Sequence, residues 1–505
     1  MRFIFKMIWN LLAIFGLFCL AGFIAGGVYF YKVKGGDGYR QLGSKVLSKA
    51  GVKSKVIGKI VRPAPVAAKP DNLILPDPGS PDWQGHGARP DRQLSPVVYF
   101  NGHQPVPLNW HRYARISPIT IQKKERIIRV DSPKGLLEAV ASAKPGDVIT
   151  LAPGTYTISA RSIPLKKGGT PGLPVVVRAA QLGSVKIRFD TFEGFVVDAP
   201  FWIFENLEIQ GVRENHDQGE HAFHILGRGK GFVLRNCRVR EFNAMIKANG
   251  SPGADGRVTY PDHALIEDSS FYNTRIRNTA KAVTFIDVVA GNGWIIRGNL
   301  LCDFAKGGGN QISYAAFIKG NARGGVFENN LVIGEYFTRG GVRVGLSFGG
   351  GGTGVKYARD AALPAEHTNG IIRNNVIMYC NDVGIYLNKA ANTKIYNNTL
   401  YGTMGVDIRF VQSSAVLKNN LSTSRLKNRD GGTSVRENNL VSDFSGWFAA
   451  PGTMDFSLAD GSRILNSAEL LPELFEDFCG NPRENIPDMG AMEYELPVCR
   501  LVGAP

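Results

Sequence analysis

The sequence predicts an all-β protein, a single-stranded right-handed parallel β-helix that follows an N-terminal transmembrane helix. Three observations support this fold class. A short apolar motif around an asparagine recurs along the chain, the intervals between its copies lack helical periodicity, and one long uncharged segment lies near the N-terminus. Repetition at a short period indicates a stacked fold, in which each repeat buries its apolar face on the next one.

Composition limits the classes of function. The 505 residues are 44% hydrophobic and 20% charged, which excludes an intrinsically disordered chain, and 6 Cys are too few for a disulfide scaffold of this length. The formal net charge is +16, but residues 1–62 hold eleven Lys or Arg and a single Asp. The basic character is therefore local, and without a nucleic-acid-binding motif it predicts no nucleic-acid partner.

Residues 7–31, which follow a short tail at 1–6, form the predicted membrane anchor. They carry no charge and one polar side chain, Asn10, and they exceed the roughly 20 residues that span a bilayer. Trp9 and Tyr31 suit the two membrane interfaces. A cleaved signal peptide is the alternative, but its apolar stretch would be only about 7–15 residues long. We expect an uncleaved single-pass anchor.

Two segments connect this anchor to the body. The basic segment 32–62 is either a lysine-rich helix on an anionic membrane surface or a solvated spacer. The proline-rich segment 63–122 is predicted to be an extended linker. Lys and Arg are more numerous after the anchor than before it, and the positive-inside rule alone would place the body in the cytoplasm.

The asparagine motif predicts the β-helix over residues 123–470. Asn and Asp tolerate the left-handed backbone of a sharp bend, and their side chains can bond to neighbouring backbone groups. Two short strands joined by such a bend, stacked many times, form a parallel β-helix. The expected bend positions are Asn206, Asn236, Asp268, Asn299, Asn330, Asn375, Asn398, Asn420 and Asn439.

The spacing of these positions locates the candidate site. The intervals are 30, 32, 31, 31 and 45 residues, followed by 23, 22 and 19. About 20 residues complete one bare coil, so the longer intervals must leave the cylinder as loops. Loops stacked on one side of a solenoid commonly carry function. We therefore expect the site between about His221 and His367.

Two end motifs resemble a known family. DSPKGLLEAVASAKPGDVITLAPGTYTI (131–158) resembles the start of the secreted β-helix polysaccharide lyases, the group that contains chondroitinase B and alginate lyases. DFCGNPRENIPDMGAMEY (477–494), in the predicted closing segment 471–505, resembles the closing signature of exported bacterial β-helix proteins. The resemblance implies a helix that caps the first coil and a body outside the cytoplasm, periplasmic or extracellular. For the topology, we give it more weight than the flanking charges.

The resemblance also implies a catalytic region, which this sequence matches in part. Such lyases carry a lysine preceded by a carboxylate pair for calcium, and an arginine one coil later. Here residues 284–299 hold one carboxylate, Asp287, and no lysine, whereas Lys319 in AFIKGNARGGVFENN (316–330) stands about where the arginine would be. Ca²⁺ is the cofactor that the family implies, and we identify no other cofactor.

The chemistry of uronate elimination selects the candidate residues. A cation must neutralise the C5 carboxylate, a base must take the C5 proton, and an acid must assist the departing O4 oxygen. A C5-epimerase shares the first two requirements. The predicted catalytic residues are Lys319, Arg323, Arg343 and His263. The predicted substrate-binding residues are Lys247, Asp287 and His367. Each cation could instead be a solvated residue on the outside of the solenoid.

Metal and disulfide sites are less well defined in the sequence. His221 and His224 alternate with apolar residues and could share a face, but a metal ion needs a third ligand that the sequence does not place. We therefore predict no metal site. Cys479 and Cys499 flank the closing motif and could pair in an oxidising compartment.

The predicted function is that of a membrane-anchored, extracytoplasmic enzyme that acts on an acidic, uronate-containing polysaccharide by β-elimination. Two alternatives stay open at this stage. One is a uronate C5-epimerase, and the other is a non-catalytic β-helix that binds polysaccharide or helps to assemble an envelope complex. A glycoside hydrolase ranks below these because the body lacks clustered acidic residues. The sequence makes no prediction of oligomeric state.

Overall fold

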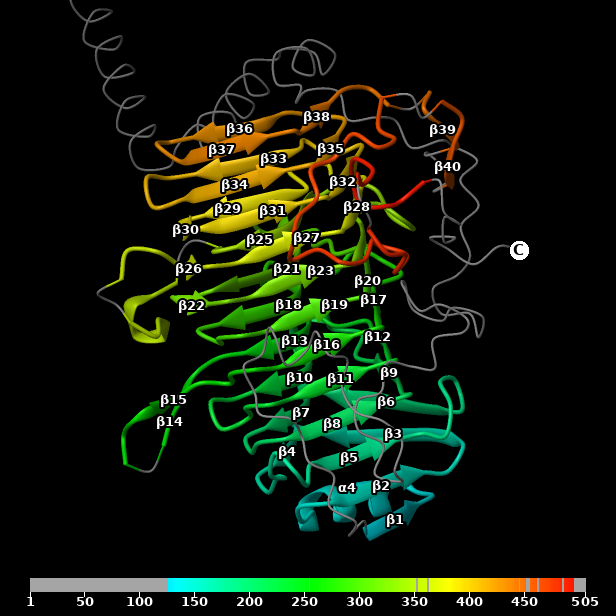
Figure 1. The fold of residues 1–505 in the computed structure, drawn as a ribbon. Coiled ribbons are helices and arrows are strands. Elements are labelled where there is room, and N and C mark those ends of the chain that lie inside the picture. The colour runs from blue at the N-terminus through cyan, green and yellow to red at the C-terminus, as the bar shows by residue number, and fades with distance from the viewer. Residues whose placement is uncertain are drawn as a thin grey trace, which may run out of the picture. The chain divides into compact units, whose positions relative to one another are not determined.

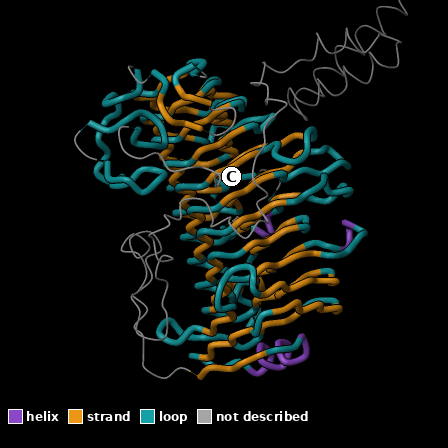
Figure 2. The backbone as a smooth tube through the Cα atoms, turned by 90° about the vertical axis from the view of Figure 1, so that its right-hand side faces the viewer, coloured by secondary structure: helices purple, strands orange, loops and turns teal. Residues whose placement is uncertain are grey.

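The computed structural model describes residues 126–253, 255–350, 353–360, 363–444, 446–450, 455–460, 463–483 and 486–494. Within them, the chain winds through three long parallel sheets, called A, B and C here, and each coil adds one strand to each sheet in that order (Figures 1 and 2). The prediction of an all-β parallel β-helix is confirmed. The strands of the coils run from residue 126 to residue 441, so they end before the expected boundary at residue 470.

The strands of the three sheets have the following bounds. Sheet A contains β1 (Arg126–Val130), β2 (Asp147–Leu151), β5 (Val175–Arg178), β8 (Trp202–Glu205), β11 (Val233–Arg235), β16 (Leu265–Glu267), β19 (Ile295–Arg297), β23 (Val326–Glu328), β27 (Ile371–Arg373), β31 (Thr393–Tyr396), β34 (Ser414–Lys418) and β37 (Thr433–Glu437). Sheet B contains β3 (Gly154–Ala160), β6 (Val185–Thr191), β9 (Glu208–Gly211), β12 (Arg238–Arg240), β17 (Ser270–Tyr272), β20 (Leu300–Cys302), β24 (Leu331–Ile333), β28 (Val376–Met378), β32 (Thr399–Tyr401), β35 (Leu421–Ser422) and β38 (Leu440–Val441). Sheet C contains β4 (Ile163–Leu165), β7 (Glu193–Val197), β10 (His221–Ile225), β13 (Ala244–Ala248), β18 (Val283–Val289), β21 (Ile312–Lys319), β25 (Val342–Phe348), β29 (Ile385–Asn388), β33 (Val406–Arg409) and β36 (Leu426–Arg429).

Helix α4 (Pro133–Ser142) caps the first coil, as the resemblance implied (Figure 1). The Ser132 hydroxyl accepts a hydrogen bond from the Gly135 amide at 3.2 Å, and a proline occupies the first turn, where a missing N–H costs nothing. Leu136 and Val140 are buried on the inner side of the helix. The helix therefore covers apolar side chains that would otherwise lie at the open end of the cylinder.

The corner between sheets A and B contains two adjacent columns of side chains. In one column every residue has a positive φ, and its members are Asn206, Asn236, Asp268, Gly298, Asn329, Asn374, Asn397, Asn419 and Asn438. In the next column, Asn299, Asn330, Asn375, Asn398, Asn420 and Asn439 form an amide ladder, in which the Nδ2 of each of the first five donates to the Oδ1 of the following member at 2.7–3.0 Å. Only the first three expected bend residues are bends. From Asn299 onward the predicted positions belong to the ladder, and the residue before each of them supplies the bend.

A column of alternating charges ends the strands of sheet A just before this corner. Its members are register partners on successive strands: Arg178, Glu205, Arg235, Glu267, Arg297, Glu328 and Arg373. Close ion pairs join Arg297 to Glu267 and Arg373 to Glu328, each at 2.6 Å. We call these residues the charge ladder. Burial of these charges is tolerated because each lies beside the opposite charge.

The closing motif docks on the same corner. Arg483 is buried, pairs with Glu493, and donates to the Asn374 Oδ1 at 3.1 Å. The Gly490 amide donates to the Asn419 carbonyl at 2.9 Å, and its φ of 90° explains the glycine. The motif thus satisfies polar groups of the bend column. Cys479 is disulfide-bonded, and Cys499 lies outside the described residues.

Two long loops leave the solenoid at one corner, between sheets C and A. One follows β13 and contains the hairpin of β14 (Ser251–Pro252) and β15 (Val258–Thr259), and the other follows β25 and contains the short helix η2 (Val355–Tyr357) (Figure 1). Arg359 joins them, because it stacks on the Tyr260 ring at 4.1 Å and pairs with Asp262. A small sheet of β22 (Ala322–Arg323), β26 (His367–Thr368) and β30 (Ala390–Ala391) lies at this corner too.

The segments predicted at 1–6, 7–31, 32–62 and 63–122 lie outside the described residues. Within the described part of the chain, no helix is both long enough and apolar enough to cross a membrane.

Candidate active site

The outer face of sheet C carries a column of side chains that changes from coil to coil. Register places one residue per strand in line, namely His224, Lys247, Asp287, Phe317, Ser347 and Tyr386. The long loops leave at the carboxyl ends of these same strands. Along this column charged and aromatic groups are not repeated from coil to coil, and all of its members except Tyr386 lie within the predicted range of His221 to His367.

Lys319 ends strand β21, two residues after Phe317. Its side chain is partly buried, and its Nζ lies 4.6 Å from the centre of the Phe317 ring. Among the described residues, no carboxylate forms an ion pair with it. Burial lowers the pKa of Lys319, opposed by the charge of Asp287 and assisted by that of Lys247, with Glu366 also raising it. A lysine of lowered pKa is neutral more often and can accept a proton.

Lys247 and Asp287 lie next to one another on the same face. The Lys247 Nζ and the Asp287 Oδ1 are 2.8 Å apart. The carboxylate of Glu366 accepts a hydrogen bond from the Gly320 amide at 2.9 Å, directly after Lys319. The structure thus brings three predicted residues, Lys247, Asp287 and Lys319, into one charged group, and adds Glu366, which was not among the residues predicted from the sequence.

The complete burial of two predicted site residues contradicts the roles predicted for them. Arg343 is fully buried, with its Nη1 3.1 Å from the Asp303 Oδ1 and its Nε donating to the Gly340 carbonyl at 2.9 Å. These contacts stabilise the corner between sheets B and C. Because Arg343 is fully buried there, it cannot contact a substrate. His367 is also fully buried, stacks on Phe348 with ring centres 4.0 Å apart, and burial lowers its pKa to about 3. It is a neutral core residue.

Arg323 and His263 lie at the corner between sheets C and A. Arg323 is exposed on β22, past the turn that follows Lys319. His263 has a φ of 61° and packs so closely on Gly293 that a Cβ there would lie 2.6 Å from its Nδ1. Arg323 is accessible at the edge of the candidate site, whereas His263 has a structural role in its turn.

An aromatic group extends the face toward the C-terminal coils. The rings of Tyr314 and Phe317 meet edge to face with centres 5.3 Å apart, and the Tyr386 hydroxyl lies 3.3 Å from Arg409 Nη1. Aromatic faces and guanidinium groups suit the apolar faces and carboxylates of sugars. These residues could not be predicted from the sequence, because only the register between strands places them near Lys319.

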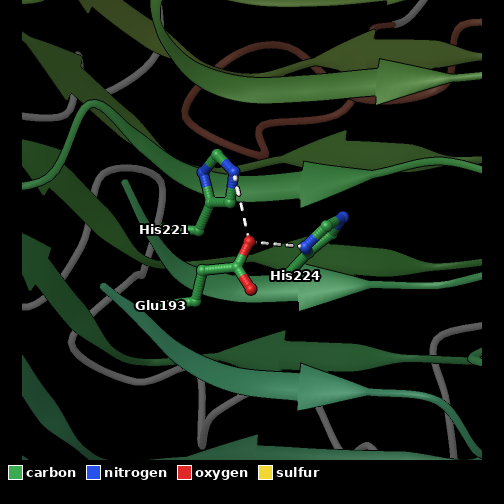
Figure 3. A group of neighbouring side chains, drawn as sticks. All are labelled: Glu193, His221 and His224. Carbon is green, nitrogen blue, oxygen red and sulfur yellow. Dashed lines mark hydrogen bonds and ion pairs between the residues drawn. The ribbon is translucent and has the colours of Figure 1, made fainter. Parts of the chain in front are cut away.

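At the N-terminal end of the same face, Glu193, His221 and His224 form a cluster (Figure 3). The Glu193 Oε1 lies 2.8 Å from the His224 Nδ1 and 3.7 Å from the His221 Nε2. Burial lowers the pKa of His221 to about 4, with a further contribution from His224. Burial would raise the pKa of Glu193, but the hydrogen bond and charge of His224 lower it. Glu193 adds a third potential metal-ligating side chain to the two histidines, and the sequence could not place it there because it comes from the preceding coil.

The residues present do not fit the calcium site that the family resemblance implied. Ca²⁺ takes six to eight oxygen ligands. Asp287 is held by Lys247, and Glu366 by the Gly320 amide. Within the described part of the chain, the one group of three or more potential metal-ligating side chains is Glu193, His221 and His224, in which two of the ligands are imidazole nitrogens.

Sequence comparison finds similarity to pectate lyases over part of the chain. Pectate lyase L of Dickeya chrysanthemi is 33% identical over 127 residues, and pectate lyase L of Dickeya dadantii (strain 3937) is 32% identical over 127 residues. In each case the match covers 21% of this chain and 30% of the relative's length. No family model matches the chain.

Solved structures of polysaccharide lyases align over a larger share of the chain. Pectate lyase Pel9A covers 73% of this chain and 97% of its own, with 17% identity and a TM-score of 0.44. A rhamnogalacturonan lyase covers 70% and 90%, with 14% identity and a TM-score of 0.47. The sequence matches confirm the resemblance to polysaccharide lyases. In sequence, the chain is similar to these enzymes over a limited part of its length.

Proposed function

We propose that this protein is a lyase that cleaves an acidic, uronate-containing polysaccharide by β-elimination, with Lys319 as the base. The observation that carries the proposal is the setting of Lys319, an unpaired lysine whose pKa burial lowers, on the face where the long loops of the solenoid meet. The partial sequence similarity to pectate lyases supports the same reaction class.

The reaction assigns a role to each group on this face. Neutral Lys319 removes the proton from C5 of a uronate, the C5 electron pair forms the C4–C5 double bond, and the bond from C4 to the glycosidic oxygen breaks. That oxygen takes a proton from solvent water, and protonated Lys319 later returns its proton to the solvent. One new chain end is therefore an unsaturated uronate and the other a hydroxyl. Lys247 supplies positive charge near the substrate carboxylate, and Arg323 can supply more from the corner. The Phe317 and Tyr314 rings offer a surface for the sugar.

An ultraviolet assay tests the proposal. The full chain is incubated with alginate, polygalacturonate, and chondroitin or dermatan chains, and the absorbance of unsaturated uronate is followed. We expect absorbance to rise with at least one chain and Lys319→Ala to lower the rate by at least about 100-fold, the contribution typical of a general base. Lys427→Ala is the matched control, because Lys427 lies exposed on strand β36 of the same sheet.

The possible outcomes separate the competing functions. Equal rates for the wild type and Lys319→Ala would remove Lys319 from the mechanism. No absorbance with any chain, together with solvent deuterium at C5, would replace elimination by epimerisation. Binding without either signal would make the protein a non-catalytic polysaccharide-binding β-helix.

We also propose that residues 7–31 tether the protein to a membrane, with the body outside the cytoplasm. The uncharged length of this segment and the closing motif at 477–494 support this topology. A reporter fused after Pro505 should be active only if it is an extracytoplasmic type. Activity of a cytoplasmic reporter alone would contradict it and would favour the topology indicated by the flanking charges.

A further inference from the structure

We propose that Glu193, His221 and His224 bind a divalent transition-metal ion of the Zn²⁺ class, with a fourth position open to the outer face of sheet C. The two histidines lie on β10, and Glu193 begins β7 on the neighbouring coil, where it is the register partner of His221. Figure 3 shows both imidazole rings beside the same carboxylate oxygen. Two imidazoles and one carboxylate form a ligand set that suits Zn²⁺.

The hydrogen bonds on the far sides of the two rings support this site. The His221 Nδ1 lies 3.3 Å from the Ala244 carbonyl, and the His224 Nε2 lies 2.8 Å from the Asn249 Oδ1. Asn249 is oriented by its own Nδ2, which donates to the Gly250 carbonyl at 3.0 Å. Metal-binding histidines typically donate their second N–H to such an acceptor. Each ring therefore directs its remaining nitrogen, His221 Nε2 or His224 Nδ1, toward Glu193.

The separations of Glu193 from the two rings are close to those of a metal site, and all three ligand atoms lie within 4.8 Å of one another. In a tetrahedral zinc site, ligand atoms about 2.0–2.2 Å from the metal lie about 3.4 Å from one another. The Glu193 Oε1 is 2.8 Å from one ring nitrogen and 3.7 Å from the other, so the observed separations bracket this value. The three side chains are 15–19% exposed, which leaves one side of the cluster accessible.

The surrounding charges permit a divalent ion. Arg161 lies near Glu193, and Lys247 is the register partner of His224. Lys247 is already paired with Asp287, which reduces its repulsion of a cation. Calcium is disfavoured because two of the three ligands are nitrogen.

The site is separate from Lys319. Strands β10 and β21 are three steps apart in sheet C, which at about 4.8 Å per step corresponds to about 14 Å. This ion therefore lies beyond direct contact with the reacting C5 atom of the proposed elimination. Metal binding and lyase activity can consequently succeed or fail independently.

Metal content and thermal stability test the proposal in the full chain. After chelator treatment and dialysis against Zn²⁺, the wild type should retain one zinc more than Glu193→Gln or His224→Gln, and Co²⁺ should give the visible absorption of a tetrahedral site. We expect each of these variants to lose at least about 100-fold in Zn²⁺ affinity, and Asn249→Ala to lose about 10–100-fold. Zn²⁺ should raise the melting temperature of the wild type more than that of the ligand variants.

Glu220→Gln is the matched control, since this neighbouring carboxylate pairs with Lys281 and lies outside the cluster. It should bind zinc like the wild type. Circular dichroism of the metal-free proteins checks that Glu193→Gln still folds. Equal zinc content and equal melting shifts in the wild type and the ligand variants would overturn the site. A melting shift as large with Ca²⁺ as with Zn²⁺ would overturn the assignment to a transition metal.

Discussion

The corner between sheets A and B and the outer face of sheet C are built by the same coils in different ways. At the corner, the same side chain or a regular alternation of charges continues over many successive coils, as Asn375 meets Asn398 and Glu328 meets Arg373. On sheet C, the aligned residues His224, Lys247 and Asp287 differ in chemistry from one coil to the next.

The difference has a physical cause. Buried polar groups at the corner must find partners, and the one partner always at hand is the equivalent residue of the next coil. The outer face is not needed for stacking, so its residues can serve a ligand. In a solenoid, repetition therefore marks the scaffold, and departure from repetition marks the candidate site.

The largest expected effect is on stability, when one carboxylate is neutralised in each region by a separate substitution. Glu205→Gln should lower the free energy of unfolding by about 3–5 kcal/mol, because it breaks the buried ion pair between Glu205 and Arg235. Asp287→Asn should cost about 1 kcal/mol or less, because Lys247 remains partly exposed to water. Denaturant unfolding of both variants measures the difference. Equal losses would show that the two regions are not energetically distinct.

The next effect separates the two columns of the asparagine corner. Asn398→Ala should cost about 1–3 kcal/mol, because it removes the amide that bonds Asn375 and Asn420. Asn397→Gly should cost less than about 1 kcal/mol, since glycine readily adopts the φ of 49° found at this bend. Thermal melting of the pair provides the comparison. A larger loss for Asn397→Gly would reverse the roles given to the ladder and bend columns.

The smallest effect concerns the pH dependence of the proposed activity. Burial lowers the pKa of Lys319, and the base is its neutral form, so kcat/KM should rise about tenfold per pH unit until the pH passes this pKa. Asp287 raises the pKa of Lys319, and Asp287→Asn should therefore shift the rising limb to lower pH. Rate profiles of the two proteins on the cleaved polysaccharide test this. An unshifted limb would mean that another group sets the pH dependence.

The sequence by itself was sufficient to predict the stacked coils of the parallel β-helix. Its asparagine motif recurs from the coil of Asn206 to the coil of Asn439, and a local pattern repeated at a fixed place needs no knowledge of tertiary contacts. It also predicted a region for the candidate site, because long intervals must emerge as loops. It could not distinguish bend from ladder at Asn329 and Asn330, since both residues are asparagine and only φ separates them.

The tertiary structure alone decided which charged residues share the site. Arg343 and His367 have the residue types that the chemistry requires, but the fold turns both inward, where Asp303 and Phe348 hold them. Glu193 joins His221 through strand pairing between coils, and Glu366 reaches the turn after Lys319 from a long loop. Orientation and register between coils arise from packing over the whole cylinder, and for this reason a linear motif could not reveal them.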